Sequence, residues 1–356
     1  MPRERSAAFA PGRVNLIGEH TDYNEGLALP FAIAAGTTVR AERLQSADGE
    51  QRIEAYATDL GESDEFPLEH PLAARGWRAF VRGTADELRR AGYPLVGARV
   101  RFGGDVPRGA GLSSSAALEV ALCLALLELG AEPGSPSPLE RVERIDIARL
   151  CARVERDWVG AQTGLLDQLA SLCGSEEQAL CIDFRALSVE HVPLRLGGWQ
   201  LVVLDSGERH AIASSGYNER REECARACRL LEIASLRDAE VEAVRGLPEP
   251  LRRRAAHVLS ENLRVLETVQ ALRAGDLPAV GRLLDASHAS LRDDYEVSTP
   301  AVEAAVARLR SAGASGARLV GGGFGGSVLG LFPPGRVPPA GTREVRPGPG
   351  ARILED

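Results

Sequence analysis

Residues 11–26 read P-G-R-V-N-L-I-G-E-H-T-D-Y-N-E-G. A short apolar run, Val14 to Ile17, ends at Gly18, and hydrogen-bonding side chains follow without a break from Glu19 to Asn24. An apolar run bounded by glycine favours a strand, which would carry the polar residues at its end. Carboxylate and imidazole groups at fixed spacing suit the hydroxyl groups of a carbohydrate, but a solvated polar loop fits the pattern equally well. This stretch alone therefore leaves both interpretations open.

Glycine and serine residues gather in a second segment, D-V-P-R-G-A-G-L-S-S-S-A-A-L-E-V-A, residues 105–121. The segment leads into a strongly apolar run that predicts a helix ending near Gly130. The first turn of a helix presents unpaired N–H groups and the positive end of the helix dipole, and small residues let an anion approach closely. The segment therefore indicates a phosphate cradle, although a serine-capped helix after a flexible turn also fits it.

Two further segments are weaker on their own. G-G-G-F-G-G, residues 321–326, lies between two apolar runs and fits either a tight hairpin or a ligand-binding loop. T-G-L-L-D-Q-L-A-S, residues 163–171, carries one carboxylate, Asp167, in an otherwise apolar helical stretch. Such an acid is either a charge on a helix surface or, where it faces a cleft, a candidate general base.

Composition excludes several classes of function. The net charge of −8 argues against binding to a phosphate backbone, so no nucleic-acid partner is expected. The chain contains no lysine, which rules out a Schiff-base lysine and the lysine of a Walker-type phosphate loop. The six cysteines form no CxxC pair, and the six histidines form no HExxH motif. We find neither a signal peptide nor a membrane-spanning run, so we expect a cytoplasmic protein with reduced cysteines and no membrane partner.

The length of 356 residues suits one large two-lobed enzyme or two fused domains, and we place the boundary near residue 190, just before a pattern typical of a buried strand. Short β-rich runs separated by turn residues favour strands, and apolar residues at helical spacing favour helices. Strands are expected at 27–33, 37–43, 51–58, 98–102 and 199–205, and helices at 75–91, 139–158 and 163–173. The Pro-rich tail from residue 332 onward is expected to be a loop. The expected lobes are residues 1–190 and 191–356.

Taken together, these segments resemble the GHMP small-molecule kinase superfamily and, within it, the galactokinase family. Residues 10–33 are similar to the galactokinase signature, residues 106–121 to the ATP motif of the superfamily, and residues 319–327 to its third motif. Further similarities lie in G-L-L-D-Q, in A-S-S-G-Y-N-E-R-R (213–221) and in S-L-R-D-D-Y-E-V-S (290–298). The first segment is specific, because most GHMP kinases share the two glycine motifs but not G-E-H-T-D-Y-N.

The resemblance implies an α+β, two-lobed GHMP kinase fold with its active site in the cleft between the lobes. Compared with the family, the second lobe has a shortened tail. The N-terminal lobe would contain a mixed sheet with helices like that of ribosomal protein S5, and the C-terminal lobe would be ferredoxin-like. The implied activity is ATP-dependent phosphorylation of D-galactose at its anomeric hydroxyl group, giving galactose 1-phosphate and ADP, the first committed step of galactose catabolism. ATP would be the co-substrate and Mg²⁺ the metal ion.

The same resemblance implies roles for individual residues. Asp167 matches the catalytic base, and Arg13 matches the nearby cation that would stabilise charge on the transferring phosphoryl group. Ser115 and Glu155 match the positions that hold Mg²⁺. The implied sugar site is lined by Glu19, His20, Thr21, Asp22 and Tyr217, and the implied phosphate loop consists of Gly109, Ala110, Gly111, Leu112, Ser113, Ser114 and Ser115.

Two alternatives stay open. A related sugar-1-kinase would act on N-acetylgalactosamine or arabinose, and a non-catalytic sensor would bind galactose and ATP without turnover. The intact S-S-S-A-A motif, together with Asp167 and Arg13, argues against the sensor. Trp77 and Phe80 match groups near the adenine pocket of the family, although two aromatic residues on one helix face also fit a core. A monomer or weak homo-oligomer is expected.

Overall fold

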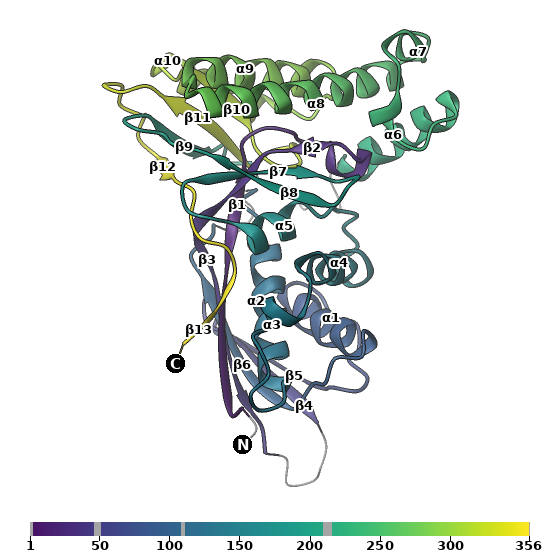
Figure 1. Ribbon diagram of the computed structural model, residues 1–356, viewed down its shortest axis with the longest axis vertical. Helices are drawn as coiled ribbons and strands as arrows, with labels where there is room; N and C mark the ends of the chain where they lie inside the picture. Colours follow the sequence, from purple (N-terminus) through teal and green to yellow (C-terminus); the bar gives the residue numbers. More distant parts are fainter. Residues whose placement is uncertain (1–2, 46–50, 108–110, 209–215, 356) are drawn as a thin grey trace.

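The computed structural model describes residues 3–45, 51–107, 111–208 and 216–355, which form two lobes stacked along the long axis of the molecule (Figure 1). A six-stranded sheet organises the N-terminal lobe, a four-stranded sheet organises the C-terminal lobe, and a three-stranded sheet lies between them. The α+β class and the two-lobed arrangement predicted from the sequence are confirmed. In the described part of the chain, no helix combines the length and apolar character needed to cross a bilayer.

The N-terminal sheet has the strand order β13-β1-β3-β6-β4-β5 and is antiparallel except between β4 and β6. Its strands are β1 (Arg5–Asn15), β3 (Pro30–Arg43), β4 (Arg52–Ala57), β5 (Glu62–Pro67), β6 (Ala98–Gly104) and β13 (Arg352–Leu354). The helices on one face of this sheet are α1 (Trp77–Arg90), α2 (Ser114–Gly130), α3 (Pro138–Arg141), α4 (Arg144–Val154) and α5 (Leu166–Cys173) (Figure 1).

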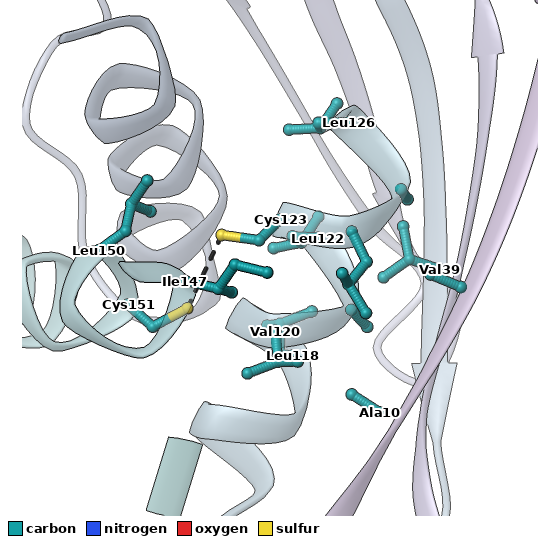
Figure 2. Close-up of a cluster of buried hydrophobic side chains, with 14 of the residues drawn as sticks. Ala10, Val39, Leu118, Val120, Leu122, Cys123, Leu126, Ile147, Leu150 and Cys151 are labelled. Atoms are coloured by element: carbon teal, nitrogen blue, oxygen red, sulfur yellow. Dashed lines mark hydrogen bonds between the residues drawn. The ribbon is translucent and has the colours of Figure 1, made fainter. Parts of the chain in front are cut away.

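Helix α2 is buried on all sides and is apolar apart from its first turn and the buried Glu119 and Glu128. It lies between the sheet and α4, and Figure 2 shows its side chains packed among those of β1, β3 and α4. The sulfur atoms of Cys123 in α2 and Cys151 in α4 are 3.7 Å apart, and both residues are free thiols. This packing fixes the direction of α2, and therefore the position of its N-terminus.

The C-terminal lobe carries an antiparallel sheet with the order β10-β11-β9-β12. Its strands are β9 (Gln200–Asp205), β10 (Gly316–Leu319), β11 (Ser327–Phe332) and β12 (Thr342–Val345). The helices of this lobe are α6 (Tyr217–Leu231), α7 (Val241–Arg245), α8 (Leu251–Ala274), α9 (Leu277–Asp293) and α10 (Pro300–Ser311). In Figure 1, α8, α9 and α10 lie together at the top of the molecule, next to β9, β10 and β11.

The two lobes share a hydrophobic core. The sheet between them contains β2 (Leu27–Ala28), β7 (Gln178–Asp183) and β8 (Ser188–Pro193). Leu16 and Ile17, the two residues that follow β1, belong to one cluster of buried side chains. The same cluster contains Val265 of α8 and Leu329 of β11. The boundary expected near residue 190 falls within β8. The lobes therefore meet over packed apolar side chains as well as across the cleft.

The structure differs from the prediction in three parts of the chain. The separate strands expected at 27–33 and 37–43 are largely one long strand, β3, because the chain stays extended through Gly36. The helix expected at 139–158 is interrupted at Val142, which has extended backbone angles and a buried side chain, and its end, η2 (Glu155–Val159), is π-helical. The tail expected to be a loop contains two short strands: β12 extends the C-terminal sheet, and β13 pairs with β1 in the N-terminal sheet.

Candidate active site

The end of β1 is shaped to bring Arg13 into the cleft. The register of β1 against β3 shifts between Pro11 and Arg13, and such a bulge re-aims the side chains beside it. A Cβ atom on Gly12 would lie 2.5 Å from the carbonyl oxygen of Leu112, so glycine is required for the close approach of the glycine–serine segment. The backbone N–H group of Arg13 donates a hydrogen bond of 3.1 Å to that same carbonyl oxygen of Leu112.

Arg13 and Asp167 form an ion pair inside the cleft. Arg13 Nη2 lies 2.7 Å from Asp167 Oδ1, and Arg13 Nη1 donates to the Gly111 carbonyl oxygen at 2.6 Å. The Ser113 hydroxyl group donates to the other carboxylate oxygen of Asp167. Asp167 stands in the first turn of α5. The structure thus brings together the predicted base, the predicted cation and the predicted phosphate loop.

The glycine–serine segment and the third glycine segment face each other. Gly111 has a φ of +71° and Ser113 a φ of +59°, and α2 begins at the next residue, Ser114. A Cβ atom on Gly111 would lie 3.2 Å from the Val320 carbonyl oxygen, at the start of the facing segment. A cavity of about 150 Å³ lies between the two segments, and the residues at the start of α2 line it. The first turn of a helix has N–H groups without partners inside the helix. Gly109 and Ala110 lie outside the described residues.

Ser115 lines this cavity, and its side chain contacts Glu155. The Ser115 hydroxyl group donates to Glu155 Oε1 at 3.1 Å, while Thr163 and Gln168 donate to Glu155 Oε2. Burial raises the pKa of Glu155 to about 7, against hydrogen bonds from Thr163 and Ser115 that lower it. Glu155 is the first residue of the π-helical turn η2, and π-helical turns inside helices are frequent at functional sites.

A second cavity joins the first at Arg13 and Asp167, and it contains most of the predicted sugar-binding residues. Its walls come from both lobes. The lining residues are Arg13, Asn15, Glu19, His20, Asp22, Thr163, Gly164, Leu166, Asp167, Tyr217, Gly321 and Gly322. Asn15, Thr163 and Gly164 were not among the predicted site residues, although each belongs to a motif that the sequence already singled out. We call this space the sugar cavity.

Glu19 is buried in the wall of the sugar cavity. Its Oε1 atom accepts a hydrogen bond of 2.7 Å from Gly321 N–H, and its Oε2 atom contacts Asn15 and Arg318. Burial raises the pKa of Glu19 to about 7, although the Arg318 guanidinium group and the Gly321 N–H group lower it. Glu19 therefore connects the third glycine segment of the C-terminal lobe to the polar loop of the N-terminal lobe.

His20 and Asp22 occupy the same cavity in different ways. The Nε2 atom of His20 donates to the Gly322 carbonyl oxygen at 3.2 Å, and Nδ1 accepts from the Tyr23 hydroxyl group at 2.8 Å. Burial lowers the pKa of His20 to about 3, so the ring is neutral and both its nitrogens already have protein partners. Burial raises the pKa of Asp22 to about 6. The Asp22 carboxylate lies directly against Gly164.

The two remaining predicted sugar residues are placed differently. Tyr217, the first residue of α6, lines both cavities, and its ring lies 5.1 Å from that of His20. Thr21 is fully buried, and its hydroxyl group bonds to the carbonyl oxygens of Gly18 and Leu27 at 2.9 and 2.7 Å. Thr21 therefore closes the loop internally and is not part of the cavity wall.

A third cavity of about 380 Å³ lies on the far side of Ser114 and Ser115. It is largely apolar, with Trp77 and Phe80 of α1 and Phe102 of β6 in its walls. The rings of Trp77 and Phe102 are 5.4 Å apart in an edge-to-face arrangement. This apolar cavity is lined by residues of the N-terminal lobe and shares Ser114 and Ser115 with the cavity at the start of α2.

Comparisons with known proteins agree with this arrangement. Family models match in three places: the galactokinase galactose-binding signature at residues 2–43, the GHMP kinases N terminal domain at residues 79–175 and the GHMP kinases C terminal domain at residues 268–345. A galactokinase of Roseiflexus sp. is 43% identical over 335 residues, covering 90% of this chain and 82% of the relative. A galactokinase of Mycobacterium tuberculosis is 42% identical over 342 residues, covering 92% and 89%.

A solved structure extends the likeness to the whole fold. The crystal structure of Lactococcus lactis galactokinase complexed with galactose superposes with a TM-score of 0.88 at 31% sequence identity. The match covers 99% of this chain and 96% of that one. The likeness therefore includes both lobes and the cleft between them.

Proposed function

The chain belongs to the galactokinase family of GHMP kinases. From this premise we propose which cavity binds the sugar, which binds the nucleotide, and which residues carry out the reaction. The activity is the ATP-dependent phosphorylation of D-galactose at its anomeric hydroxyl group, giving galactose 1-phosphate and ADP. The single observation that carries the mechanism is the Arg13–Asp167 pair, because it stands where the sugar cavity meets the cavity at the start of α2.

In the proposed reaction, galactose occupies the sugar cavity with its anomeric hydroxyl group toward Asp167. Asp167 accepts the proton of that hydroxyl group as the sugar oxygen bonds to the γ-phosphorus and the bond to the leaving ADP oxygen breaks. Arg13 stabilises the negative charge spread over the transferring phosphoryl group. The contact between Arg13 and the Gly111 carbonyl group keeps the guanidinium group at the junction of the cavities.

The sugar contacts that we propose come from three sides of the cavity. Glu19 and Asp22 supply carboxylate acceptors, and Tyr217 closes the cavity from the C-terminal lobe. Because both nitrogens of His20 already have partners, we propose that His20 shapes the cavity wall beside Tyr217. Thr21 supports the loop from within.

The phosphates of ATP would lie against residues 111–115, because unpaired N–H groups and the positive end of the helix dipole attract anions. The cavity beyond Ser114, lined by Trp77 and Phe80, is apolar enough and large enough to take the adenine base. A nucleotide laid from this cavity to Arg13 would point its terminal phosphate at the sugar cavity.

A divalent cation fits beside the phosphate loop. Ser115 Oγ and Glu155 Oε1 are hard oxygen donors 3.1 Å apart, and Mg²⁺ is commonly held by one or two protein oxygens with phosphate oxygens and waters. We propose that these two residues hold Mg²⁺, which would neutralise charge on the phosphates when bound.

The test is a coupled assay for ADP release with galactose, N-acetylgalactosamine, glucose and arabinose as acceptors. We expect turnover with galactose, and we expect Asp167→Ala to abolish it while the variant keeps the wild-type circular dichroism spectrum and Tm. Asp157→Ala is the matched control, because Asp157 is an exposed acid paired only with its neighbour Arg156 among the described residues. Undiminished turnover in Asp167→Ala would refute the proposed base.

A further inference from the structure

Three side chains of α8 hold the backbone of the loop at residues 18–27, which we call the sugar loop. Glu261 Oε1 accepts a hydrogen bond of 3.0 Å from Gly18 N–H. His257 Nε2 donates to the Glu19 carbonyl oxygen at 3.2 Å. Asn262 Oδ1 accepts a bond of 2.8 Å from Leu27 N–H. Both ends of the sugar loop are therefore fixed to one helix of the C-terminal lobe.

The acceptor at Glu261 is itself fixed. Glu261 is fully buried. The Ser287 hydroxyl group of α9 donates to its Oε1 atom, and Arg264 Nε donates to its Oε2 atom, both at 2.6 Å. Because each oxygen of this carboxylate has a partner in the C-terminal lobe, the position of Gly18 follows the position of α8 and α9.

The sugar loop adopts backbone angles that need such support. Gly18 has a φ of +96°, and a Cβ atom there would lie 2.6 Å from Ala28 Cα. His20 has a φ of +63°, which is unfavourable for a residue other than glycine. Such angles persist only where the surrounding structure imposes them. The contacts of Glu261 and His257 fall on the residues immediately before His20, where this constraint is required.

We propose that His257, Glu261 and Asn262 are positioning residues that set the affinity for galactose through the backbone of the sugar loop. None of the three lines the sugar cavity, so they act on the sugar only through Glu19, Asp22 and their neighbours. The inference rests on the proposed role of this loop in holding galactose. It makes sugar affinity depend on the C-terminal lobe, while none of the three side chains lines the described part of the cavity at the start of α2.

The first test is Glu261→Ala. Gly18 N–H loses its buried partner, so we expect the galactose KM to rise about tenfold or more, while the ATP KM and kcat at saturating galactose stay within about twofold of wild type. Isothermal titration of galactose should show the same loss in the Kd. The matched control is Glu267→Ala, which removes an exposed glutamate from the same helix and should leave every constant unchanged.

A second pair of variants keeps the test decisive if Glu261→Ala does not fold. Asn262 is only partly buried, so both of its variants are expected to fold. Asn262→Ala removes the acceptor for Leu27 N–H and should raise the galactose KM several-fold, whereas Asn262→Asp keeps an acceptor oxygen and should restore it. An unchanged galactose KM in folded Asn262→Ala, or an equal loss toward galactose and ATP, would overturn the inference.

Asp22→Ala separates this inference from the proposed function. If Asp22→Ala weakens galactose binding and the α8 variants do not, the sugar loop assignment stands and the role of α8 is wrong. If Asp22→Ala leaves galactose binding unchanged, the sugar loop itself is misassigned. If the wild-type chain shows no galactose-dependent ADP release, the proposed function fails before the variants are compared.

Discussion

Glu19 offers a direct test of how burial and ion pairing compete in the sugar cavity. Its side chain is 3% exposed, and burial raises its pKa to about 7, although Arg318 and the Gly321 N–H group act in the opposite direction. Near neutral pH, folded Glu19 therefore passes from the neutral to the charged form. Glu19→Gln replaces it with a neutral side chain of nearly the same shape, so the variant isolates the effect of this one proton.

The direction follows from proton linkage. Between pH 4.5 and about 7, the unfolded chain has released the proton of Glu19 and the folded chain still holds it. The proton on Glu19 therefore stabilises the folded chain relative to the unfolded chain. This contribution is complete below pH 4.5 and is lost as the pH rises through about 7. Each pH unit between the unfolded and the folded pKa changes the free energy of unfolding by about 1.36 kcal/mol. The free energy of unfolding should thus fall by about 3 kcal/mol across this window because of Glu19 alone.

The assay is equilibrium urea denaturation of the wild type and of Glu19→Gln from pH 5 to pH 8. Other titrating groups act equally in both proteins, so the difference between their free energies of unfolding reports Glu19. We expect the Gln variant to gain about 2.5 kcal/mol relative to wild type from pH 5 to pH 8, because about two pH units of this range lie below the folded pKa of Glu19. Glu267→Gln, at an exposed site of α8, should give a difference that does not change with pH.

Two results would refute this reasoning. A difference that stays flat across the range would mean that the pKa of Glu19 is the same in the folded and unfolded chains. A difference of opposite slope would mean that the ion pair with Arg318 outweighs burial and that folded Glu19 is charged throughout. In the second case the carboxylate would be a stronger acceptor for sugar hydroxyl groups than its burial suggests.

Three further changes test other parts of the structure. A methyl group on Gly164 would lie 1.9 Å from Asp22 Oδ2, so Gly164→Ala should displace that carboxylate and raise the galactose KM about tenfold or more; an unchanged KM in the coupled assay would contradict the placement of Asp22. Leu122→Ala removes a fully buried side chain of α2 and should lower the free energy of unfolding by about 3 kcal/mol in urea denaturation, whereas Leu72→Ala, at a site that is 75% exposed, should change it little. Burial raises the pKa of Glu119 well above its usual value, and the stabilisation this brings is lost only as the pH rises through that raised pKa. Burial thus favours the uncharged carboxyl group, which an amide resembles in shape and polarity, so Glu119→Gln should change the free energy of unfolding by less than about 1 kcal/mol; a much larger loss would show that burial does not hold this side chain uncharged.

The sequence predicted those helices and strands that depend mainly on neighbouring residues. The glycine–serine segment predicted a helix start, and α2 begins at Ser114 within it. The apolar run at residues 14–17 was expected to be a strand ending at Gly18, but only its first two residues lie in β1, which ends at Asn15. The proximity of Arg13 and Asp167 came from the family resemblance, because residues this far apart in the chain carry no mutual spacing signal. The pairing itself depends on the bulge at Gly12, which only the sheet register reveals.

Other parts of the site had no local signal. H-V-L-S-E-N, residues 257–262, lies in a long helix whose apolar spacing is ordinary, and its contacts with the sugar loop exist only because the two lobes pack together. Thr21 belongs to the polar run, yet its hydroxyl group turns inward to backbone carbonyls. The strands of the tail were also hidden, because β13 is defined by its partner β1 and not by its own composition.

The pairing of β13 with β1 has a consequence for the order of folding during synthesis. Residues 7–9 leave the ribosome early, yet their partners on that edge, residues 352–354, are made more than three hundred residues later. An unpaired strand edge is a template for incorrect association, and contacts so distant in sequence form slowly. The N-terminal sheet therefore spends most of translation with an open edge at β1, and it acquires its final strand only after the entire C-terminal lobe has emerged.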